Sequence, residues 1–164
     1  MQSSSIAVTV DALARRRARA TSLDLWEVTE ESAAGPKEIT VVSGVPKGLS
    51  IKVDLNMLRI VLRNLVSNAI KFTHPRGTVD IGATRTASEV TVTVKDTGIG
   101  IPGERMSQMF LMDKGYQSRG TAGEKGTGLG LRLCKDFVEA MGGRIWIESV
   151  EGSGTIVSFT IRDS

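Results

Sequence analysis

Residues Leu55 to Thr73 constrain the fold of this chain more than any other stretch, because their apolar side chains recur at helical spacing. Steps of three and four residues place these side chains in one stripe on a single helix. Such a stripe is typical of an amphipathic helix that packs one face on a core. The stripe consists of Leu58, Val61, Leu62, Leu65, Val66, Ala69 and Ile70.

A second set of side chains runs beside the stripe, over the C-terminal half of the predicted helix. The set is Asn64, Asn68, Lys71 and Phe72. Amide oxygens can ligate Mg²⁺, an ammonium can neutralise phosphate, and an aromatic ring can lie against a base. This combination is typical of a site for a cation–phosphate complex. Taken alone, the stretch favours the simpler interpretation of an ordinary helix with solvated polar residues beside its buried face.

Length and cysteine content limit the class of protein. A chain of 164 residues suits one domain with a sizeable core. The single cysteine, Cys134, excludes an internal disulfide and suits a reducing compartment, so we expect a cytoplasmic location. We also expect no membrane contact by this domain itself, because no apolar run approaches a membrane span and no signal peptide opens the sequence. The cytoplasmic part of a membrane-bound sensor would fit the same observations.

The net charge of +3 does not indicate a nucleic-acid-binding face. The arginines at positions 15, 16, 17 and 19, less Asp11, account for all of it, and the rest of the chain is neutral. This cluster lies outside the predicted folded body, and a solvated helix end explains it better than a nucleic-acid patch. We therefore expect no nucleic-acid partner.

Turn residues divide the chain into a tail and one folded domain. Residues 1–20 form a polar tail and a helix, Val10–Ala20, that we interpret as the end of a longer preceding helix. Within residues 21–164 we expect a short strand or a lead-in at Ser22–Trp26. The predicted helices are Glu27–Ala34, Leu55–Thr73 and Gly103–Phe110, with another ending at Met141. The predicted strands are Ile39–Ser43, Leu49–Val53, Thr78–Thr84, Glu89–Lys95, Arg144–Ser149 and Thr155–Arg162. This order predicts an α+β fold, a two-layer sandwich with helices on one mixed, mostly antiparallel sheet.

A glycine-rich segment, Gly126–Leu131, leads into the last predicted helix. Its alternate glycines let a ligand approach the backbone where a helix begins, and free N–H groups there form an anion site. The segment does not fit a dinucleotide-binding fold, which requires a strand immediately before the loop. A polar segment of about fifteen residues precedes it instead, long enough for a functional lid. Taken alone, such a glycine run also serves as a plain turn.

A second glycine-rich segment, Asp96–Pro102, places a carboxylate at the end of a strand. Gly98 and Gly100 leave room beside Asp96, which can accept a hydrogen bond from an amino group such as that of adenine. One alternative is a simple turn in which the aspartate binds its own backbone. Another is the Asp-Thr-Gly triplet of aspartic proteases, but that mechanism needs two carboxylates, so this chain would have to act as a homodimer. The protease would also leave Asn64 and Asn68 unexplained.

Taken together and in order, these segments resemble the ATP-binding catalytic domain of two-component sensor histidine kinases, in the GHKL superfamily. The resemblance runs from about Ser22 to Arg162 and implies a Bergerat-type ATP-binding fold. It covers an N box at Asn64–Thr73, a G1 box at Asp96–Gly100, an F box at Phe110, a G2 box at Gly126–Leu131, and the stretches 135–149 and 152–155.

The resemblance implies a role for each residue that matches a box. Asn68 would ligate Mg²⁺ and Asn64 would lie at the phosphates, while Lys71 would contact phosphate and these three would form the catalytic set. Phe72 would contact adenine, and Asp96 would accept from its amine with support from Thr155 through water. Residues 102–125 would form a lid over ATP, in which Lys114, Arg119 or Lys125 reaches the γ-phosphate. The implied nucleotide site is Asn64, Asn68, Lys71, Phe72, Asp96, Gly98, Gly100, Ile101, Phe110, Lys125, Gly126, Thr127, Gly128, Leu129, Gly130, Leu131 and Thr155.

Three positions depart from the family pattern. Asp113 stands where the F box commonly has a second aromatic, as in some sensor-kinase subfamilies. His74, the only histidine, is followed by Pro75 rather than by the acidic residue usual after a phosphoacceptor. The resemblance therefore implies that Val10–Ala20 is the end of a preceding dimerisation and phosphoacceptor helix. Asn64 stands where ATPases of the superfamily carry a glutamate base, so a protein acceptor fits better than water.

The resemblance therefore implies a protein-histidine kinase domain that binds Mg-ATP. It would donate the γ-phosphate to a histidine on a separate dimerisation domain, normally part of the same polypeptide in a homodimer, with a response regulator downstream. Two alternatives stay open: an ATP-sensing module without transfer activity, and a serine kinase of the anti-sigma type.

Overall fold

The computed structural model describes residues 5–7, 37–46, 49–111, 119–123, 126 and 128–162. The predicted helices Val10–Ala20 and Glu27–Ala34, the predicted strand Ser22–Trp26 and the arginine cluster lie outside the described residues. Within the described part of the chain, no helix has the length and apolar character needed to cross a membrane.

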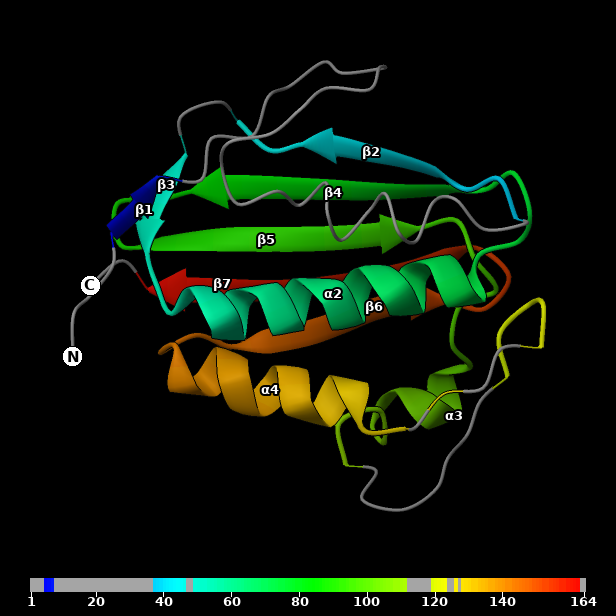
Figure 1. Ribbon diagram of the computed structural model, residues 1–164. Helices are drawn as coiled ribbons and strands as arrows, with labels where there is room; N and C mark the ends of the chain where they lie inside the picture. The colour runs from blue at the N-terminus through cyan, green and yellow to red at the C-terminus, as the bar shows by residue number, and fades with distance from the viewer. Residues whose placement is uncertain are drawn as a thin grey trace.

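A five-stranded sheet forms one layer of the fold. Its strand order is β2-β4-β5-β7-β6, where β2 is parallel to β4 and the other neighbours are antiparallel. This arrangement confirms the predicted mixed, mostly antiparallel sheet (Figure 1). The strands are β2 (Thr40–Gly44), β4 (Thr78–Arg85), β5 (Glu89–Asp96), β6 (Ile145–Val150) and β7 (Gly154–Arg162).

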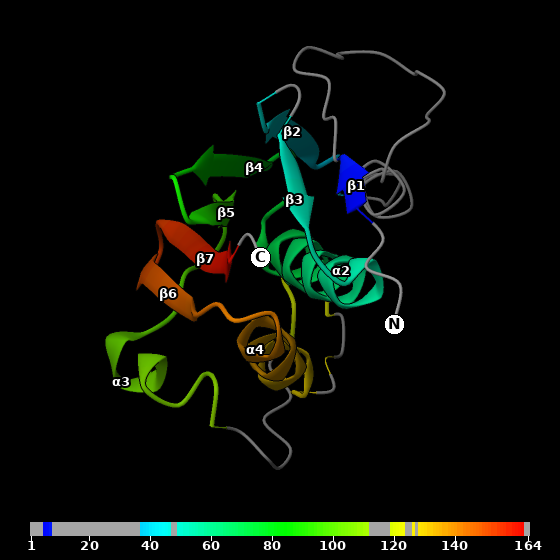
Figure 2. The ribbon, with the colours of Figure 1, turned by 90° about the vertical axis from the view of Figure 1, so that its left-hand side faces the viewer.

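Two helices form the second layer. The long helix α2 (Leu55–Phe72) and the helix α4 (Gly130–Ala140) lie side by side on one face of the sheet, as the edge-on view shows (Figure 2). The short helix α3 (Gly103–Met106) lies beside β6. A separate pair of antiparallel strands, β1 (Ser5–Ala7) and β3 (Ser50–Lys52), precedes α2; β1 falls within the stretch predicted as a tail.

The helix α2 begins and ends where its local chemistry requires. Asp54 caps its N-terminus, because the Asp54 carboxylate accepts from the backbone N–H groups of Asn56 and Met57 at 2.9 and 3.0 Å. At the other end Thr73 is extended, and the proline that follows His74 prevents the helix from continuing. The predicted helix is therefore confirmed to within one residue.

The core lies between α2 and the sheet. Six residues of the predicted apolar stripe of α2 are buried. The strand β5 buries alternate residues, Val90, Val92 and Val94, as its period-two pattern predicts. On the next strand of the sheet, Phe159 and Ile161 pair with Val92 and Val90 and are fully buried, so β5 and β7 both contribute to the core.

The helix α4 completes the helical layer by packing on α2. Cys134 and Val138 are fully buried, and the Cys134 thiol lies 3.7 Å from the Val61 carbonyl oxygen. Burial raises the pKa of the Cys134 thiol to about 12, which keeps the thiol un-ionised. The cysteine is therefore a packing residue.

The prediction for the helix Gly103–Phe110 was too long. The helix α3 ends at Met106, and residues 107–111 continue as turns. The reason lies in the backbone hydrogen bonds: Gln108 donates to Arg105 and Met109 to Met106, each three residues back. Such bonds form tighter turns than the four-residue bonds of an α-helix.

Removing the N-terminal cap of α2 tests how far this helix depends on Asp54. We expect Asp54→Ala to lower the free energy of unfolding by about 1 kcal/mol, because two backbone donors lose their side-chain acceptor. Asp54→Ser should restore most of the loss, since a hydroxyl oxygen also caps. Urea denaturation of the three chains measures the difference. Equal stability of Asp54→Ala and the unchanged chain would contradict the capping role.

Candidate functional site

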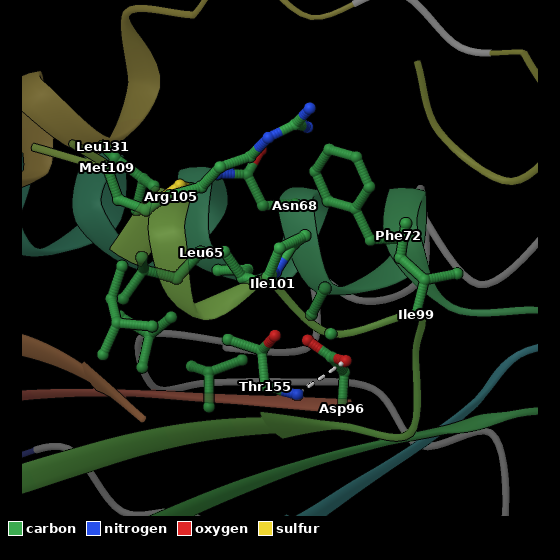
Figure 3. A pocket seen from close by; sticks show the side chains of 16 residues that line it. Leu65, Asn68, Phe72, Asp96, Ile99, Ile101, Arg105, Met109, Leu131 and Thr155 are labelled. Carbon is green, nitrogen blue, oxygen red and sulfur yellow. Dashed lines mark hydrogen bonds between the residues drawn. The ribbon is translucent and has the colours of Figure 1, made fainter. Parts of the chain in front are cut away.

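One pocket lies between the C-terminal half of α2, the ends of β5 and β7, and the segment after β5. It is mainly apolar, and Asp96 and Arg105 are the charged residues among the described residues that line it (Figure 3). The lining residues are Leu65, Asn68, Ala69, Phe72, Val94, Asp96, Ile99, Gly100, Ile101, Pro102, Arg105, Met109, Leu131, Ile147, Thr155 and Val157.

Asp96 is the polar centre of this pocket. It is the last residue of β5 and faces the helices, because it continues the buried alternation of that strand. Its Oδ1 accepts from the backbone N–H of Gly98 at 2.8 Å and from that of Thr155 at 3.2 Å. Within the described part of the chain the other oxygen, Oδ2, has no hydrogen-bond partner. It is also not among the buried polar atoms that lack a partner, so it is accessible. The carboxylate therefore offers a free acceptor to the pocket.

Burial also shifts the pKa of Asp96. The side chain is 7% exposed, and desolvation raises the pKa of its carboxyl above the ordinary value. The hydrogen bonds from Gly98 and Thr155 act in the opposite direction and partly offset the rise in pKa. A desolvated acceptor of this kind discriminates strongly between a donor and an acceptor on a ligand.

Two glycines allow the loop after β5 to pass close to its neighbours. A Cβ at Gly98 would lie 2.3 Å from the carbonyl oxygen of Phe72. Gly100 has φ +68°, and a Cβ there would lie 2.1 Å from the Val150 carbonyl oxygen. The N–H of Ile99 donates to the Phe72 carbonyl at 3.0 Å, so this loop is attached directly to the end of α2. The glycines thus keep Asp96 next to α2.

The helix α2 contributes one wall of the pocket. Asn68 and Phe72, one turn apart, are half-buried and both line it. The Lys71 ammonium lies 4.7 Å from the centre of the Phe72 ring, where the two can form a cation–π contact. Asn64 lies one turn before Asn68, and its side-chain amide donates to the Ile60 carbonyl at 2.9 Å. A Cβ on Gly130 would meet the Asn64 oxygen at 2.9 Å, so the start of α4 adjoins Asn64.

The structure brings seven of the predicted site residues together around the pocket: Asn68, Phe72, Asp96, Gly100, Ile101, Leu131 and Thr155. Eight described ones do not line it: Asn64, Lys71, Gly98, Phe110, Gly126, Gly128, Leu129 and Gly130. Among these, Gly98 holds Asp96 and Asn64 adjoins Gly130, so both lie next to lining residues. Lys125 and Thr127, like Lys114 and Asp113, lie outside the described residues.

Sequence reasoning missed nine residues that line the pocket: Leu65, Ala69, Val94, Ile99, Pro102, Arg105, Met109, Ile147 and Val157. Helical spacing could have found Leu65 and Ala69, each three residues before a predicted site residue. Strand alternation could have found Val94, two residues before Asp96. Arg105 and Met109 fall within residues 102–125, which the resemblance implied as a lid, but neither was named as a site residue. Arg105 lies on α3 and Met109 in the turns that follow it.

Replacing Asp96 by asparagine should change how stability depends on pH. A carboxyl with a raised pKa binds its proton more tightly in the folded state. Its contribution to stability is therefore complete below the unfolded pKa of about 4 and is lost as the pH rises through the folded pKa. We expect the unfolding free energy of the unchanged chain, minus that of Asp96→Asn, to fall as the pH rises from about 4.

Urea denaturation at a series of pH values measures this difference. Asp80→Asn is the matched control, because Asp80 lies on β4 at a half-buried position outside the pocket. A difference that stays constant, or that rises with pH, would contradict the raised pKa.

Comparison with known proteins places the chain in a family. Residues 53–164 match the family described as "Histidine kinase-, DNA gyrase B-, and HSP90-like ATPase". The sensor histidine kinase WalK of Bacillus subtilis is 34% identical over 144 residues, which cover 85% of this chain and 22% of WalK. The adaptive-response sensory kinase SasA of Synechococcus elongatus is 40% identical over 127 residues, covering 76% of this chain and 32% of SasA. The chain thus spans about a fifth to a third of these curated relatives.

Solved structures agree with this assignment. The catalytic domain of the histidine kinase ThkA, in a nucleotide-free form, matches with a TM-score of 0.70 and 28% identity over 84% of this chain and 86% of that domain. Full-length ShkA in complex with AMPPNP matches with a TM-score of 0.68 and 28% identity over 84% of this chain and 28% of ShkA. On the family match and these likenesses, the chain belongs to the histidine kinase-, DNA gyrase B- and HSP90-like ATPases.

Proposed function

We propose that this domain binds Mg-ATP and donates the γ-phosphoryl group to a histidine on a separate dimerisation and phosphoacceptor domain. The observation that carries the proposal is the free acceptor of Asp96 at the bottom of an apolar pocket whose wall holds Asn68 and Phe72. Membership of the family and the sensor-kinase relatives support the same activity.

Asp96 and its neighbours suit the adenine base. The exocyclic amine of adenine is a donor that the free carboxylate oxygen can accept, and the apolar walls suit the faces of the ring. Thr155 donates its N–H to Asp96, and its hydroxyl lies 2.8 Å from the Ser149 hydroxyl. These two hydroxyl groups can form hydrogen bonds with a water molecule beside the base. The pocket thus favours adenine over guanine, which presents a carbonyl where adenine presents its amine.

Asn68, Lys71 and Asn64 suit the phosphates and the metal. Magnesium in nucleotide sites is commonly held by one or two protein oxygens together with substrate phosphates and water. One amide oxygen from Asn68 fits that donor set, and the described residues contain no cluster of three carboxylates, histidines or cysteines that would hold a metal by itself. When bound, Mg²⁺ would neutralise charge on the phosphates. Lys71 would contact phosphate beside it, with Asn64 nearby.

The chemistry of Asn64, Asn68 and Lys71 favours transfer to a protein acceptor. An amide such as Asn64 cannot take a proton from water, so hydrolysis has no base among these side chains. Phosphoryl transfer relies on positioning and charge stabilisation, which an in-line histidine can exploit. His74 is exposed in a turn next to Pro75, outside the pocket, so we assign the acceptor to another domain. A homodimer containing that domain, and a response regulator downstream, complete the proposal, which we locate in the cytoplasm.

Nucleotide titration tests the role of Asp96. We expect the unchanged chain to bind ATP in preference to GTP. Asp96→Asn should weaken ATP binding by about 1.5–3 kcal/mol, the range for a hydrogen bond to a charged group, while Asp80→Asn should leave affinity unchanged. Isothermal titration calorimetry gives both affinities. Equal affinity for ATP and GTP would refute the assignment of Asp96 to adenine.

The role of Asn68 is tested by repeating the titration with and without Mg²⁺. We expect Asn68→Ala to remove most of the Mg²⁺ enhancement of ATP affinity while the helix survives, since alanine is the better helix former. Asn56→Ala is the matched control, because Asn56 is an exposed asparagine in the first turn of the same helix. Full Mg²⁺ enhancement in Asn68→Ala would exclude this residue as the ligand.

Labelling with radioactive ATP tests the direction of transfer. We expect almost no self-phosphorylation and very slow hydrolysis by this chain, and weak labelling of an added dimerisation domain that bears an acceptor histidine. The labelling should be weak because covalent linkage normally supplies the local concentration. Strong self-labelling that disappears in His74→Ala would overturn the assignment. ATP binding without labelling of any acceptor domain would favour a sensing module instead.

A further inference from the structure

Lys37 has an environment that is unusual for a lysine. Its side chain is 6% exposed, whereas lysines are almost never fully buried unless they are partnered. The ammonium donates to two backbone carbonyls, those of Ile70 at 3.2 Å and Lys71 at 2.7 Å. Both carbonyls belong to the last turn of α2, more than thirty residues away along the chain. Lys37 also lies outside residues 53–164, where the family match lies.

The carbonyls of this turn need partners from elsewhere, because the last four carbonyls of a helix have none within it. Thr73 satisfies two of them: its hydroxyl donates to Ala69 at 2.6 Å and its N–H to Ile70 at 3.3 Å. The N–H of Ile99 donates to the Phe72 carbonyl. The Lys37 ammonium donates to the Lys71 carbonyl and, together with the Thr73 N–H, to the Ile70 carbonyl. Its positive charge also interacts favourably with the negative end of the helix dipole.

A third segment joins at the same point. The N–H of Thr121 donates to the Lys71 carbonyl at 3.1 Å, and the Thr121 hydroxyl donates to the Thr73 carbonyl at 2.9 Å. The Lys71 carbonyl therefore holds Lys37 and Thr121 together. We call these contacts of Lys37, Thr121 and the carbonyls of Lys71 and Thr73 the carbonyl junction.

The carbonyl junction adjoins one wall of the pocket. Phe72 lines the pocket, and its carbonyl anchors the loop at Ile99. Lys71 carries the junction carbonyl, and its ammonium lies 4.7 Å from the centre of the Phe72 ring. We propose that Lys37 is a positioning residue that acts through these carbonyls, which fix the last turn of α2 and attach segment 119–123 beside the site. This inference rests on the proposed function for its effect on ATP, but the attachment of segment 119–123 does not.

A purely structural lysine would affect stability alone. A positioning lysine also affects ATP affinity at temperatures where the protein is fully folded, and it couples to Thr121 because both donate to one carbonyl. Coupling between two neighbouring sites appears as non-additivity in a double-mutant cycle. A nucleotide-independent readout is available as well, since Arg119 is exposed two residues before Thr121 and trypsin cleaves after arginine.

The experiment compares Lys37→Met, Lys37→Arg, Thr121→Val and the double variant Lys37→Met with Thr121→Val. Lys95→Met is the matched control, because Lys95 is an exposed lysine on β5. ATP dissociation constants are measured by calorimetry well below the melting temperature of each variant. The rate of tryptic cleavage after Arg119 is followed by mass spectrometry without nucleotide.

We expect Lys37→Met to weaken ATP binding about tenfold, the equivalent of one hydrogen bond at the upper end of its range, and Lys37→Arg to recover part of the loss. Thr121→Val should weaken binding severalfold, the double variant should lose less than the product of the two, and both single variants should be cleaved faster after Arg119. The Lys95→Met control should match the unchanged chain in both readouts.

Unchanged ATP affinity and cleavage in a folded Lys37→Met would overturn the positioning role and leave the proposed function standing. Should Lys37→Met not fold, Thr121→Val decides: unchanged affinity and cleavage there overturn the junction. Absence of ATP binding by the unchanged chain would overturn the proposed function and the effect of Lys37 on ATP, while the cleavage rates would still test the attachment of segment 119–123.

Discussion

The burial of one face of α2 against the sheet is the interaction on which the rest of the structure depends. Leu58, Val61, Leu65 and Val66 fill the space between the two layers, which orients the helix about its own axis. Once that face is fixed, the neighbouring face must lie along the edge of the core. Asn68 and Phe72 occupy that edge and therefore line the pocket. Packing energy thus determines where the polar side chains of the site lie.

The same packing leaves an electrostatic problem at the end of α2, where the helix carbonyls meet a buried region. Backbone acceptors that are buried without partners cost about 1–3 kcal/mol each, so each must find a donor. The donors come from Thr73, the loop at Ile99, Lys37 and Thr121. At its end, α2 therefore meets three other segments of the chain, through Lys37, Ile99 and Thr121. Side chains that we propose to contact the ligand lie in the same turn of the helix.

The Asp96 carboxylate, in contrast to these carbonyls, has incomplete hydrogen bonding. Its burial is unfavourable for the charged form, and the structure compensates with only two backbone donors, both on one oxygen. The second oxygen is left without a partner within the described part of the chain and is open to the pocket. An incompletely satisfied, desolvated carboxylate is a strong acceptor for a ligand donor. Such a group is expected at a functional site and would be unfavourable in an ordinary turn.

Much of the fold could be predicted from the sequence because its signals are local. The bounds of α2 and β5 were predicted to within a residue or two. The signals were the helical period of the apolar residues in α2, the alternation in β5 and the glycines that follow each element. The helix after Pro102 was predicted too long, because the polar and apolar side chains of residues 107–110 fit a helix and tight turns equally well. Neither the pairing order of the strands nor the parallel pairing of β2 with β4 has a local signal, so both came from the structure.

The sequence by itself determined the chemistry of the site: two amides, a lysine, a ring, a carboxylate and glycines at fixed spacings, which is why the resemblance to sensor kinases was visible in the order of short motifs. Only the tertiary structure decided which of them meet around one pocket, and it added Arg105, Met109 and Ile147, which the sequence had not singled out as site residues. It also decided the burial of Lys37. A lysine beside a proline is ordinary in sequence, and its burial against the carbonyls of Ile70 and Lys71 depends on contacts between segments that are distant along the chain.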